Sequence, residues 1–349
     1  SSEVMEDREF ILLYLETDDG AGVWSEVVVS QTPFYTYETV GTAWHILDAF
    51  MIPAVLWVEI ADPSEVTRLL QPIRGHNMAR AGLEMGAWGL EAVRRNLPLW
   101  ELLGGRRTEI EVGVSIGIQE SIPALLARLE AFLAQGYRRI KLKIRPGWDV
   151  EVLREVRRAF PDIPLMVDAN AAYTLDDLPH LQQLDAFDLL MIEQPLDYDD
   201  IIEHARLQQE LQTPICLDES IHSVADARKA LELGACRVIN IKPGRVGGFL
   251  PSREIHDLCA AHGIPVWCGG MLESGVGRAY NIALASLPNF RLPGDTAGSD
   301  RYWRQDIIDP PVRVTPRGTI PVPQTPGLGF TVRRDRIERV TLRRRVYTV

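Results

Sequence analysis

The sequence predicts an α/β fold, a modified (β/α)7β TIM barrel that carries an α+β capping domain. Seven short runs rich in Val, Ile and Leu are each followed by an amphipathic helical pattern, and this repeat favours parallel strands covered by helices. Charged residues recur in five of these runs about every 25 residues, which is the length of one strand-and-helix unit of a barrel. The 349 residues leave enough chain for a second unit beside the barrel.

The capping domain is predicted from residues 1–110, together with residues 316–349 at the other end of the chain. Residues 9–29 have the pattern of a β-hairpin, because two apolar runs flank the turn Asp18-Asp19-Gly20. Helical patterns follow to about Asn96, and the clearest of them begins at Met78. A hairpin combined with helices indicates an α+β unit.

The barrel is predicted from residues 111–315. Seven units that run in one direction, with more chain after the last, favour a closed barrel over an open sheet. The expected strands lie at residues 112–118, 138–144, 164–170, 189–195, 214–220, 238–243 and 265–270.

The composition excludes several classes of protein. Asp and Glu (48) outnumber Lys and Arg (37), giving a net charge of −11, which disfavours a nucleic-acid partner. The one basic run, from Arg333 to Arg345, is interpreted as a solvated edge strand. No apolar run approaches the roughly 18 residues of a membrane span, so no membrane partner is expected. The four cysteines form no C-x-x-C pair and are expected to be reduced core thiols of a cytoplasmic protein: Cys216, Cys236, Cys259 and Cys268.

Five charged residues stand out within the apolar strands, namely Lys143, Asp168, Glu193, Asp218 and Lys242. Their separations are 25, 25, 25 and 24 residues, so each falls near the C-terminal end of its strand. Barrel enzymes keep their active sites at that face. A single such residue would be interpreted as a helix cap or a surface charge. Five in register, with period-2 alternation pointing them inward, indicate a functional site.

The chemistry of these five residues indicates a metal-assisted reaction. Three carboxylates brought together repel one another unless a cation neutralises them, and oxygen ligands without His or Cys favour Mg²⁺, with Mn²⁺ as a possible substitute. We therefore predict one divalent ion on Asp168, Glu193 and Asp218. A lysine whose pKa is lowered by the metal, by Lys141 and by partial burial can act as a base. The expected substrate is a small carboxylate whose α-proton is removed to give an enediolate.

At this point the sequence resembles the muconate-lactonizing-enzyme subgroup of the enolase superfamily. The K-x-K motif of that subgroup matches Lys141-Leu142-Lys143, and its metal ligands match Asp168 in VDAN, Glu193 in IEQP and Asp218 in LDES. Its lysine on the sixth strand matches Lys242 in INIKPGRVGG. The resemblance covers nearly the whole chain, and the pairing of a Lys base with Mg²⁺ is known for this superfamily.

Within the subgroup, the chain is most similar to o-succinylbenzoate synthases of the kind that also racemise N-acylamino acids. The resemblance implies dehydration of a cyclohexadiene carboxylate to o-succinylbenzoate in menaquinone biosynthesis. It implies that Lys143 is the base, which returns its proton to the leaving hydroxyl, while cationic Lys242 stabilises the anionic intermediate. In racemisation the two lysines would serve opposite faces of the substrate. The resemblance also implies a homo-oligomer, from dimer to octamer.

Further residues are expected around this core. Asn170 and Glu219 should orient the metal ligands and the lysines. The stretch after the seventh strand has two interpretations. Its glycines let backbone N–H groups approach a ligand, which the resemblance identifies as the succinyl tail, or they form a tight strand-to-helix turn. The candidate residues of this stretch are Gly269, Gly270, Met271, Glu273 and Ser274.

The chain departs from the family pattern in its cap. Ser25 replaces a glycine of the D-G-x-x-G-W-G-E motif, and Gly89 stands where an aspartate is common. The family also has a strand and loop before the hairpin, so either this sequence is truncated or its cap is reduced. These differences concern the domain that shapes specificity, and they leave the metal ligands and lysines intact.

Three alternatives remain open from the sequence. The first is an N-succinylamino acid racemase that uses the same site. The second is a Schiff-base aldolase with Lys242 as nucleophile, which leaves the three acids unexplained. The third is a barrel that serves as a binding scaffold without catalysis.

Overall fold

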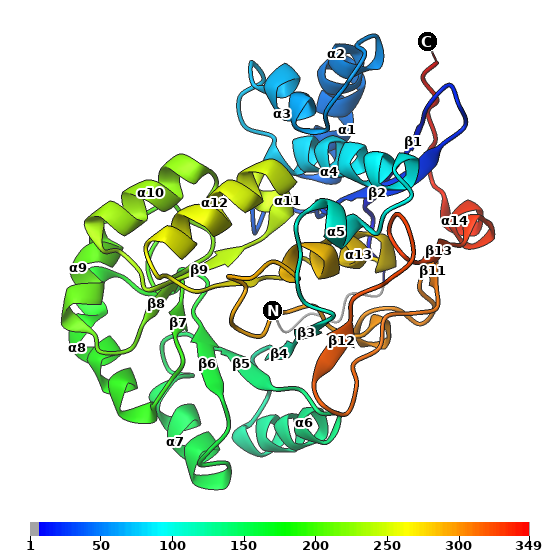
Figure 1. Cartoon of the computed structure of the whole chain (residues 1–349). Helices are drawn as coiled ribbons and strands as arrows, with labels where there is room; N and C mark the ends of the chain where they lie inside the picture. The colour runs from blue at the N-terminus through cyan, green and yellow to red at the C-terminus, as the bar shows by residue number, and fades with distance from the viewer. Residues whose placement is uncertain (1–6, 349) are drawn as a thin grey trace.

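The computed structural model describes residues 7–348 and contains a barrel, a cap and a C-terminal segment that lies against both (Figure 1). The barrel strands are parallel neighbours in the order β10-β9-β8-β7-β6-β5-β4. All seven predicted strands are confirmed, with bounds β4 Gly113–Ile116, β5 Arg139–Lys143, β6 Leu165–Asp168, β7 Ile192–Glu193, β8 Ile215–Leu217, β9 Val238–Ile241 and β10 Val266–Cys268.

An eighth segment, residues 289–295, closes the barrel between its two edge strands. On one side Val266 N donates to Asn289 O at 3.2 Å, beside β10. On the other side Gly113 N donates to Gly294 O at 2.7 Å, at the start of β4. The ring of strands is therefore complete, as the (β/α)7β interpretation expects.

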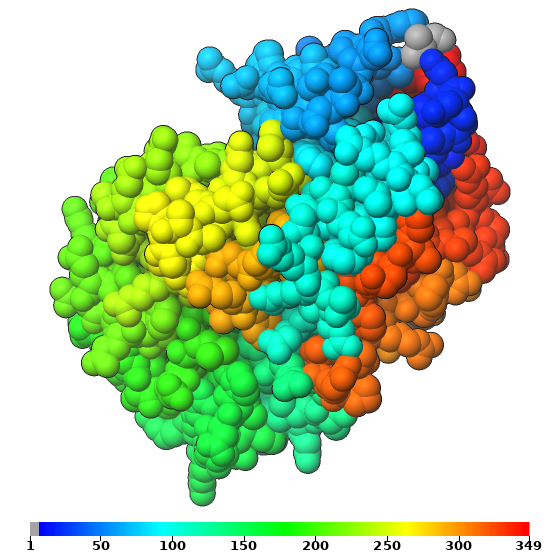
Figure 2. Space-filling view, viewed as in Figure 1, coloured from blue at the N-terminus to red at the C-terminus, as the bar shows by residue number. Residues whose placement is uncertain are grey.

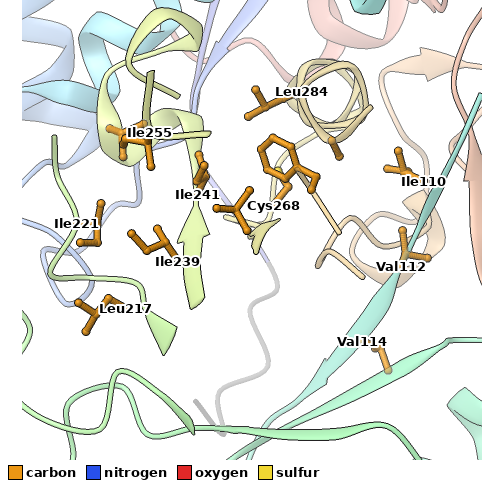
Figure 3. Close-up of a cluster of buried hydrophobic side chains, with 14 of the residues drawn as sticks. Ile110, Val112, Val114, Leu217, Ile221, Ile239, Ile241, Ile255, Cys268 and Leu284 are labelled. Carbon is orange, nitrogen blue, oxygen red and sulfur yellow. The ribbon is translucent and has the colours of Figure 1, made fainter. Parts of the chain in front are cut away.

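Helices cover the outside of this barrel (Figure 1). Period-2 alternation turns one set of strand side chains towards them, and Figure 3 shows Ile239 and Ile241 of β9 on the same side as Ile255 of a covering helix. The helices are α6 Ile122–Ala134, α7 Val150–Ala159, α8 Leu178–Leu181, α9 Ile202–Glu210, α10 Val224–Leu233, α11 Pro243–Val246, α12 Phe249–Ala261 and α13 Gly275–Ala285.

The other set of side chains fills the barrel interior in two layers. The lower layer is an apolar cluster of Met166, Met191, Cys216, Val238 and Trp267. Two residues further along the same strands, the side chains become polar: Asp168, Glu193, Asp218 and Asn240. Because alternate residues share a face, the polar layer lies directly above the apolar plug, which separates it from the bottom of the barrel.

The cap combines an antiparallel hairpin with a group of helices. The hairpin consists of β1 Ile11–Glu16 and β2 Gly22–Val27, which confirms the hairpin predicted from the sequence. The helix predicted from Met78 is α4, Asn77–Arg94. The remaining cap helices are α1 Val40–Ile46, α2 Ile52–Leu56, α3 Ser64–Leu70 and α5 Leu99–Leu102, with a π-helical turn at Leu47–Met51.

Small residues allow α4 to lie close to the hairpin. A methyl group at Gly82 would overlap Val27 Cγ2, and one at Gly86 would lie 2.8 Å from Leu15 Cδ1. Gly89, where the family pattern has an aspartate, faces Tyr280 of α13, whose oxygen would lie 2.5 Å from an added Cβ. The glycine at this position is therefore explained by contact with the barrel.

Two buried carboxylates of the cap hold it to the N-terminal ends of barrel helices. Glu84 of α4 accepts from Phe249 N at 2.6 Å and Leu250 N at 2.9 Å, where α12 begins. Glu26 of β2 accepts from Ser274 N and Gly277 N, both at 3.0 Å, at the start of α13. A helix N-terminus has unsatisfied N–H groups and a partial positive charge, so a carboxylate suits both.

The C-terminal segment joins the cap to the barrel. In it β12 (Thr319–Pro321) pairs with β3 (Glu109–Glu111), and β11 (Ile308–Asp309) pairs with β13 (Thr331–Val332). The red C-terminal segment lies against the blue hairpin in Figure 2. Arg345 pairs with Asp48 of the cap at 3.1 Å. The prediction that the basic run is an edge strand is wrong, because residues 334–340 form helix α14, Arg334–Val340, in which Ile337 is buried on the core.

The four cysteines are free and buried, as predicted. Burial raises the pKa of the Cys236 thiol, so this group stays protonated at neutral pH. Among the described residues, no helix is both long and apolar enough to cross a membrane.

We predict that Gly82→Ala destabilises the protein, because the added methyl must displace Val27 in a packed core. The expected cost is about 1–3 kcal/mol in the free energy of unfolding, measured by urea denaturation. Gly41→Ala is the matched control. Its added methyl on α1 meets nothing closer than Thr39 Oγ1 at 3.9 Å, so this variant should be neutral or slightly stabilised. Equal stability of the two variants would contradict the close-packing explanation.

Candidate active site

The five charged residues predicted from their spacing converge at the C-terminal end of the barrel. Lys143, Asp168 and Glu193 end β5, β6 and β7, while Asp218 and Lys242 directly follow β8 and β9. Lys143 is the register partner of Asp168, which is the partner of Glu193. A large cleft under the cap reaches this face, and both Lys143 and Lys242 line it.

Lys141 lies two residues before Lys143 on the same face of β5 and forms ion pairs with three acids. Its Nζ is 2.6 Å from Asp295 Oδ2, 3.0 Å from Glu193 Oε2 and 3.3 Å from Asp168 Oδ2. It also lies 5.0 Å from the ring centroid of Trp267. Burial alone would lower the pKa of Lys141, but the carboxylates outweigh burial and raise this pKa well above its usual range.

Lys143 is the most accessible of the three lysines, with a side chain 22% exposed. Its Nζ is 2.6 Å from Asp168 Oδ2 and 2.6 Å from Asn170 Oδ1. Asn170 has a positive φ of 43° and donates through Nδ2 to Glu219 Oε1 at 2.9 Å. Asn170 thus connects Lys143 to Glu219, and the prediction that this pair orients the lysines and metal ligands stays a prediction.

Lys242 lies across the barrel from Lys143 and is buried beside Asp218. Its Nζ is 2.7 Å from Asp218 Oδ2 and donates to the Tyr35 hydroxyl at 3.0 Å. Burial opposes the charge of Lys242, but Asp218 outweighs it and raises the pKa of this lysine. A raised pKa agrees with the cationic Lys242 that the family resemblance implies. Tyr35 comes from the loop between β2 and α1.

Arg245 of α11 completes the surroundings of Asp218. It pairs with Asp218 Oδ1, donates through Nε to Ile221 O at 2.6 Å, and is only 3% exposed. Burial would raise the pKa of Asp218, but Lys242 and Arg245 outweigh burial and lower it. Asp218 is therefore ionised at neutral pH.

In the loop after β10, several polar groups already form hydrogen bonds within the protein. Gly269 leaves room for Lys242, because a Cβ there would lie 2.6 Å from Lys242 Cε. Glu273 accepts from Met271 N at 2.9 Å, and Ser274 caps α13 by accepting from Val276 N at 3.2 Å. The carboxylate of Glu273 and the hydroxyl of Ser274 thus bond to the protein itself, while Gly270, Met271 and Ser274 line the cleft.

The three predicted metal ligands suit a hard divalent cation by chemistry. All are carboxylates at most 1% exposed, and they lie on or directly after three neighbouring strands. Burial raises the pKa of Glu193 to about 8, together with the negative charges of Asp168 and Asp218. Lys141 lowers this pKa and only partly offsets the rise. Nearby, Glu219 Oε2 is buried without a hydrogen-bond donor among the described residues. This donor set fits an oxygen-preferring ion.

The side chains are nevertheless not arranged around an ion. Among residues 7–348, no three His, Cys, Asp or Glu side chains form a cluster that could hold a metal. Glu193 accepts from Lys141, Asp168 accepts from Lys143, and Asp218 accepts from Lys242. Carboxylates of like charge repel, so ammonium groups within reach compensate them separately.

Sequence reasoning assigned no site role to five residues of this network: Tyr35, Arg139, Asn240, Arg245 and Asp295. Asn240 donates to Glu193 Oε1 at 2.8 Å, and Asp295 pairs with Arg139 at 2.8 Å as well as with Lys141. Asn240 shares its strand face with Lys242, so alternation alone could have identified it. Asp295, Tyr35 and Arg245 lie outside the repeating strands, and no spacing rule points to them.

Two family models together match most of the chain. Residues 1–104 match the mandelate racemase/muconate lactonizing enzyme N-terminal domain, and residues 124–336 match the enolase C-terminal domain-like family. Among curated relatives, an o-succinylbenzoate synthase of Geobacillus kaustophilus is 57% identical over 334 residues, which cover 96% of this chain and 89% of the relative. An N-succinylamino acid racemase of Amycolatopsis sp is 50% identical over 335 residues, covering 96% and 90%.

Solved structures agree with this assignment. An enolase-superfamily member from Enterococcus faecalis V583 matches with a TM-score of 0.90 and 45% identity, covering 95% of this chain and 89% of the other. Muconate lactonizing enzyme from Pseudomonas putida matches with a TM-score of 0.88 and 25% identity, covering 95% and 93%. The fold resemblance therefore spans both the barrel and the cap.

We predict that Lys141→Met destabilises the protein, because three buried carboxylates lose a shared cation. The expected cost at pH 7, with a chelator present, is about 3–5 kcal/mol by chemical denaturation. Without Lys141 the pKa values of the buried acids rise in the folded state. The loss should therefore grow as pH rises and shrink as acidification protonates them.

Lys229→Met is the control, because it removes an exposed lysine 3.4 Å from Asp226 on α10. This substitution should change the free energy of unfolding by no more than about 0.5 kcal/mol. A Lys141→Met variant as stable as this control at pH 7 would refute the role given to Lys141.

Proposed function

This chain belongs to the mandelate racemase/muconate lactonizing enzyme family of the enolase superfamily, and we propose that it is an o-succinylbenzoate synthase. The proposed reaction dehydrates 2-succinyl-6-hydroxy-2,4-cyclohexadiene-1-carboxylate to o-succinylbenzoate. The observation that carries the proposal is the pair of lysines, Lys143 and Lys242, on opposite sides of a buried carboxylate trio. Enzymes of this family generally depend on a divalent metal ion.

The first step is removal of the α-proton by Lys143. Neutral Lys143 Nζ takes the proton from the carbon next to the substrate carboxylate, and the electron pair moves into the carboxylate to give an enediolate. Lys143 is suited to this role because it lines the cleft and is partly exposed. Asn170 Oδ1 accepts from its Nζ and fixes its position.

The second step is loss of the hydroxyl group. The enediolate electrons form the new ring double bond as the C–O bond breaks, and the Lys143 ammonium returns its proton, so that water leaves. The ring becomes aromatic, which favours the forward direction. Lys242, whose raised pKa keeps it cationic, stabilises the negative charge from the other side.

Asp168, Glu193 and Asp218 would hold Mg²⁺, with Mn²⁺ as a possible substitute. When bound, this ion supplies positive charge that lowers the energy of the enediolate. The connected network contains five carboxylates (Asp168, Glu193, Asp218, Glu219 and Asp295) and five cations (Arg139, Lys141, Lys143, Lys242 and Arg245). When Lys143 is neutral, as the base must be, four cations remain and the formal charge of the network is −1, so a divalent ion would make it positive, which suits an anionic substrate.

The same site supports N-succinylamino acid racemisation as a second function. Lys143 on β5 and Lys242 after β9 are separated by three strands of the ring, so they face a substrate from opposite directions. One lysine would remove the α-proton and the other would return a proton to the opposite face. The racemase relative from Amycolatopsis supports this alternative.

A Schiff-base aldolase is less well supported. A lysine must be neutral to attack a carbonyl group, whereas Asp218 keeps Lys242 charged. We further propose, from the resemblance, that the protein acts in the cytoplasm as a homo-oligomer.

We predict that Lys143→Ala lowers kcat/KM for dehydration by at least about 10²-fold, because the step loses its base. The assay follows formation of o-succinylbenzoate in the presence of Mg²⁺, and α-proton exchange in deuterated water isolates the first step. Arg154→Ala is the control, since it removes an exposed charge on α7, outside the cleft. Wild-type enzyme that racemises N-succinylamino acids but does not dehydrate the cyclohexadiene would favour the second function.

We also predict that calorimetry detects Mg²⁺ binding and that Asp168→Asn weakens it at least about tenfold. The amide keeps the shape of the side chain but removes its charge. Asp226→Asn, a half-buried position on α10 outside the cleft, should bind Mg²⁺ as wild type does. The absence of Mg²⁺ and Mn²⁺ binding, together with activity that survives chelation, would refute the metal assignment.

A further inference from the structure

The names of both kinds of relative share a chemical feature. o-Succinylbenzoate and N-succinylamino acids each carry a carboxylate at the ring or amino acid and a second carboxylate at the end of a succinyl group. The enediolate chemistry uses only the first. We propose that Arg301 binds the second, so that this residue sets a preference for dicarboxylate substrates. The inference rests on the proposed function and concerns how the same cleft recognises the tail.

Arg301 belongs to the wall of the active-site cleft. It ends a 3-10 turn, Ser299–Arg301, shortly after the segment that closes the barrel. Its Nη2 donates to the carbonyl oxygen of Ser115 at 3.3 Å. Ser115 is the register partner of Lys141 in the neighbouring strand. Arg301 is therefore anchored to the strand next to the one that carries Lys141 and Lys143, and it is among the residues that line the extended cleft.

Aromatic rings hold the guanidinium of Arg301 in place. Its Cζ lies 5.1 Å from the ring centroid of Phe132 and 5.3 Å from that of Tyr302. Phe132 is itself buried in the barrel core. A guanidinium fixed in this way presents a planar fork that matches a carboxylate, and it loses little freedom on binding one.

The charge of Arg301 is not compensated as the other site cations are. Lys141, Lys143, Lys242 and Arg245 each have a carboxylate partner. Within residues 7–348, no carboxylate lies within ion-pair distance of Arg301, although Asp300 precedes it. Its Nε is buried and lacks a hydrogen-bond acceptor in that range. The substrate tail would supply the missing negative charge.

The loop after β10 is less suited to hold this charge. Gly269 N already donates to Ile241 O at 3.1 Å, Met271 N to Glu273 at 2.9 Å, and Ser274 N to Glu26 at 3.0 Å. Three of the backbone donors near the predicted tail contact are thus occupied. The loop can pack against the methylene groups of the tail, while Arg301 takes its carboxylate.

The test compares two ligands that differ only in the tail carboxylate, o-succinylbenzoate and o-butanoylbenzoate. Their dissociation constants are measured by calorimetry on the Mg²⁺-loaded protein. Arg301→Gln should raise the dissociation constant of o-succinylbenzoate by about 10- to 100-fold and leave that of o-butanoylbenzoate nearly unchanged. Arg301→Lys keeps the charge but loses the planar guanidinium, so its dissociation constant for o-succinylbenzoate should lie between those of wild type and Arg301→Gln.

Arg304→Gln is the matched control, because Arg304 lines the same cleft but is exposed. It should keep the wild-type preference, and thermal unfolding of each variant verifies the fold. Equal weakening of both ligands in Arg301→Gln, or the same loss in Arg304→Gln, would overturn the inference and leave the proposed function standing. Wild-type protein that binds neither ligand would overturn both.

Discussion

The structure depends on placing five carboxylates and five basic side chains close together at the top of the barrel, where four of the acids pair directly with cations and Glu219 accepts from Asn170. A buried charge without a partner costs several kcal/mol, which favours an arrangement in which acids and cations contact one another. Lys141 forms ion pairs with three acids, and Asp218 forms ion pairs with two cations. Below this layer the apolar plug around Trp267 keeps water from entering through the bottom of the barrel. The barrel walls therefore serve both to pack the core and to set the electrostatics of the site.

The cap is part of the same arrangement. Glu84 and Glu26 accept from the first N–H groups of α12 and α13, so the cap sits on barrel helices at fixed points. Burial raises the pKa of Glu84 to about 7, and the hydrogen bonds from Leu250 N, Phe249 N and Trp88 oppose that shift. Tyr35 extends from the cap to Asp218 and Lys242. The position of the cap therefore affects a residue that touches the proposed catalytic lysine.

The barrel and its five charged residues could be predicted because both follow from short-range periodicity. A strand places alternate residues on one face, and a strand-and-helix unit has a characteristic length. Tyr35 could not be predicted, because it lies 207 residues from Lys242 in sequence and reaches it only through the docking of the cap. The helix at Arg334–Val340 differs from the predicted edge strand, and its apolar residues Ile337 and Val340 are three residues apart, a spacing that fits a helix. In that segment the contact of Ile337 with the core decides the conformation.

The segment that closes the barrel carries Asp295, an ion-pair partner of two residues that are synthesised much earlier. Arg139 donates to Pro293 O across 154 residues of chain, and its ion partner Asp295 lies just beyond. Lys141 has its shortest ion pair with that same Asp295. A chain emerging from the ribosome consequently makes most of the barrel before the residue that compensates Arg139 and Lys141 has been synthesised. The catalytic layer becomes electrostatically complete only when the last strand docks, so maturation of the site is a late event of folding.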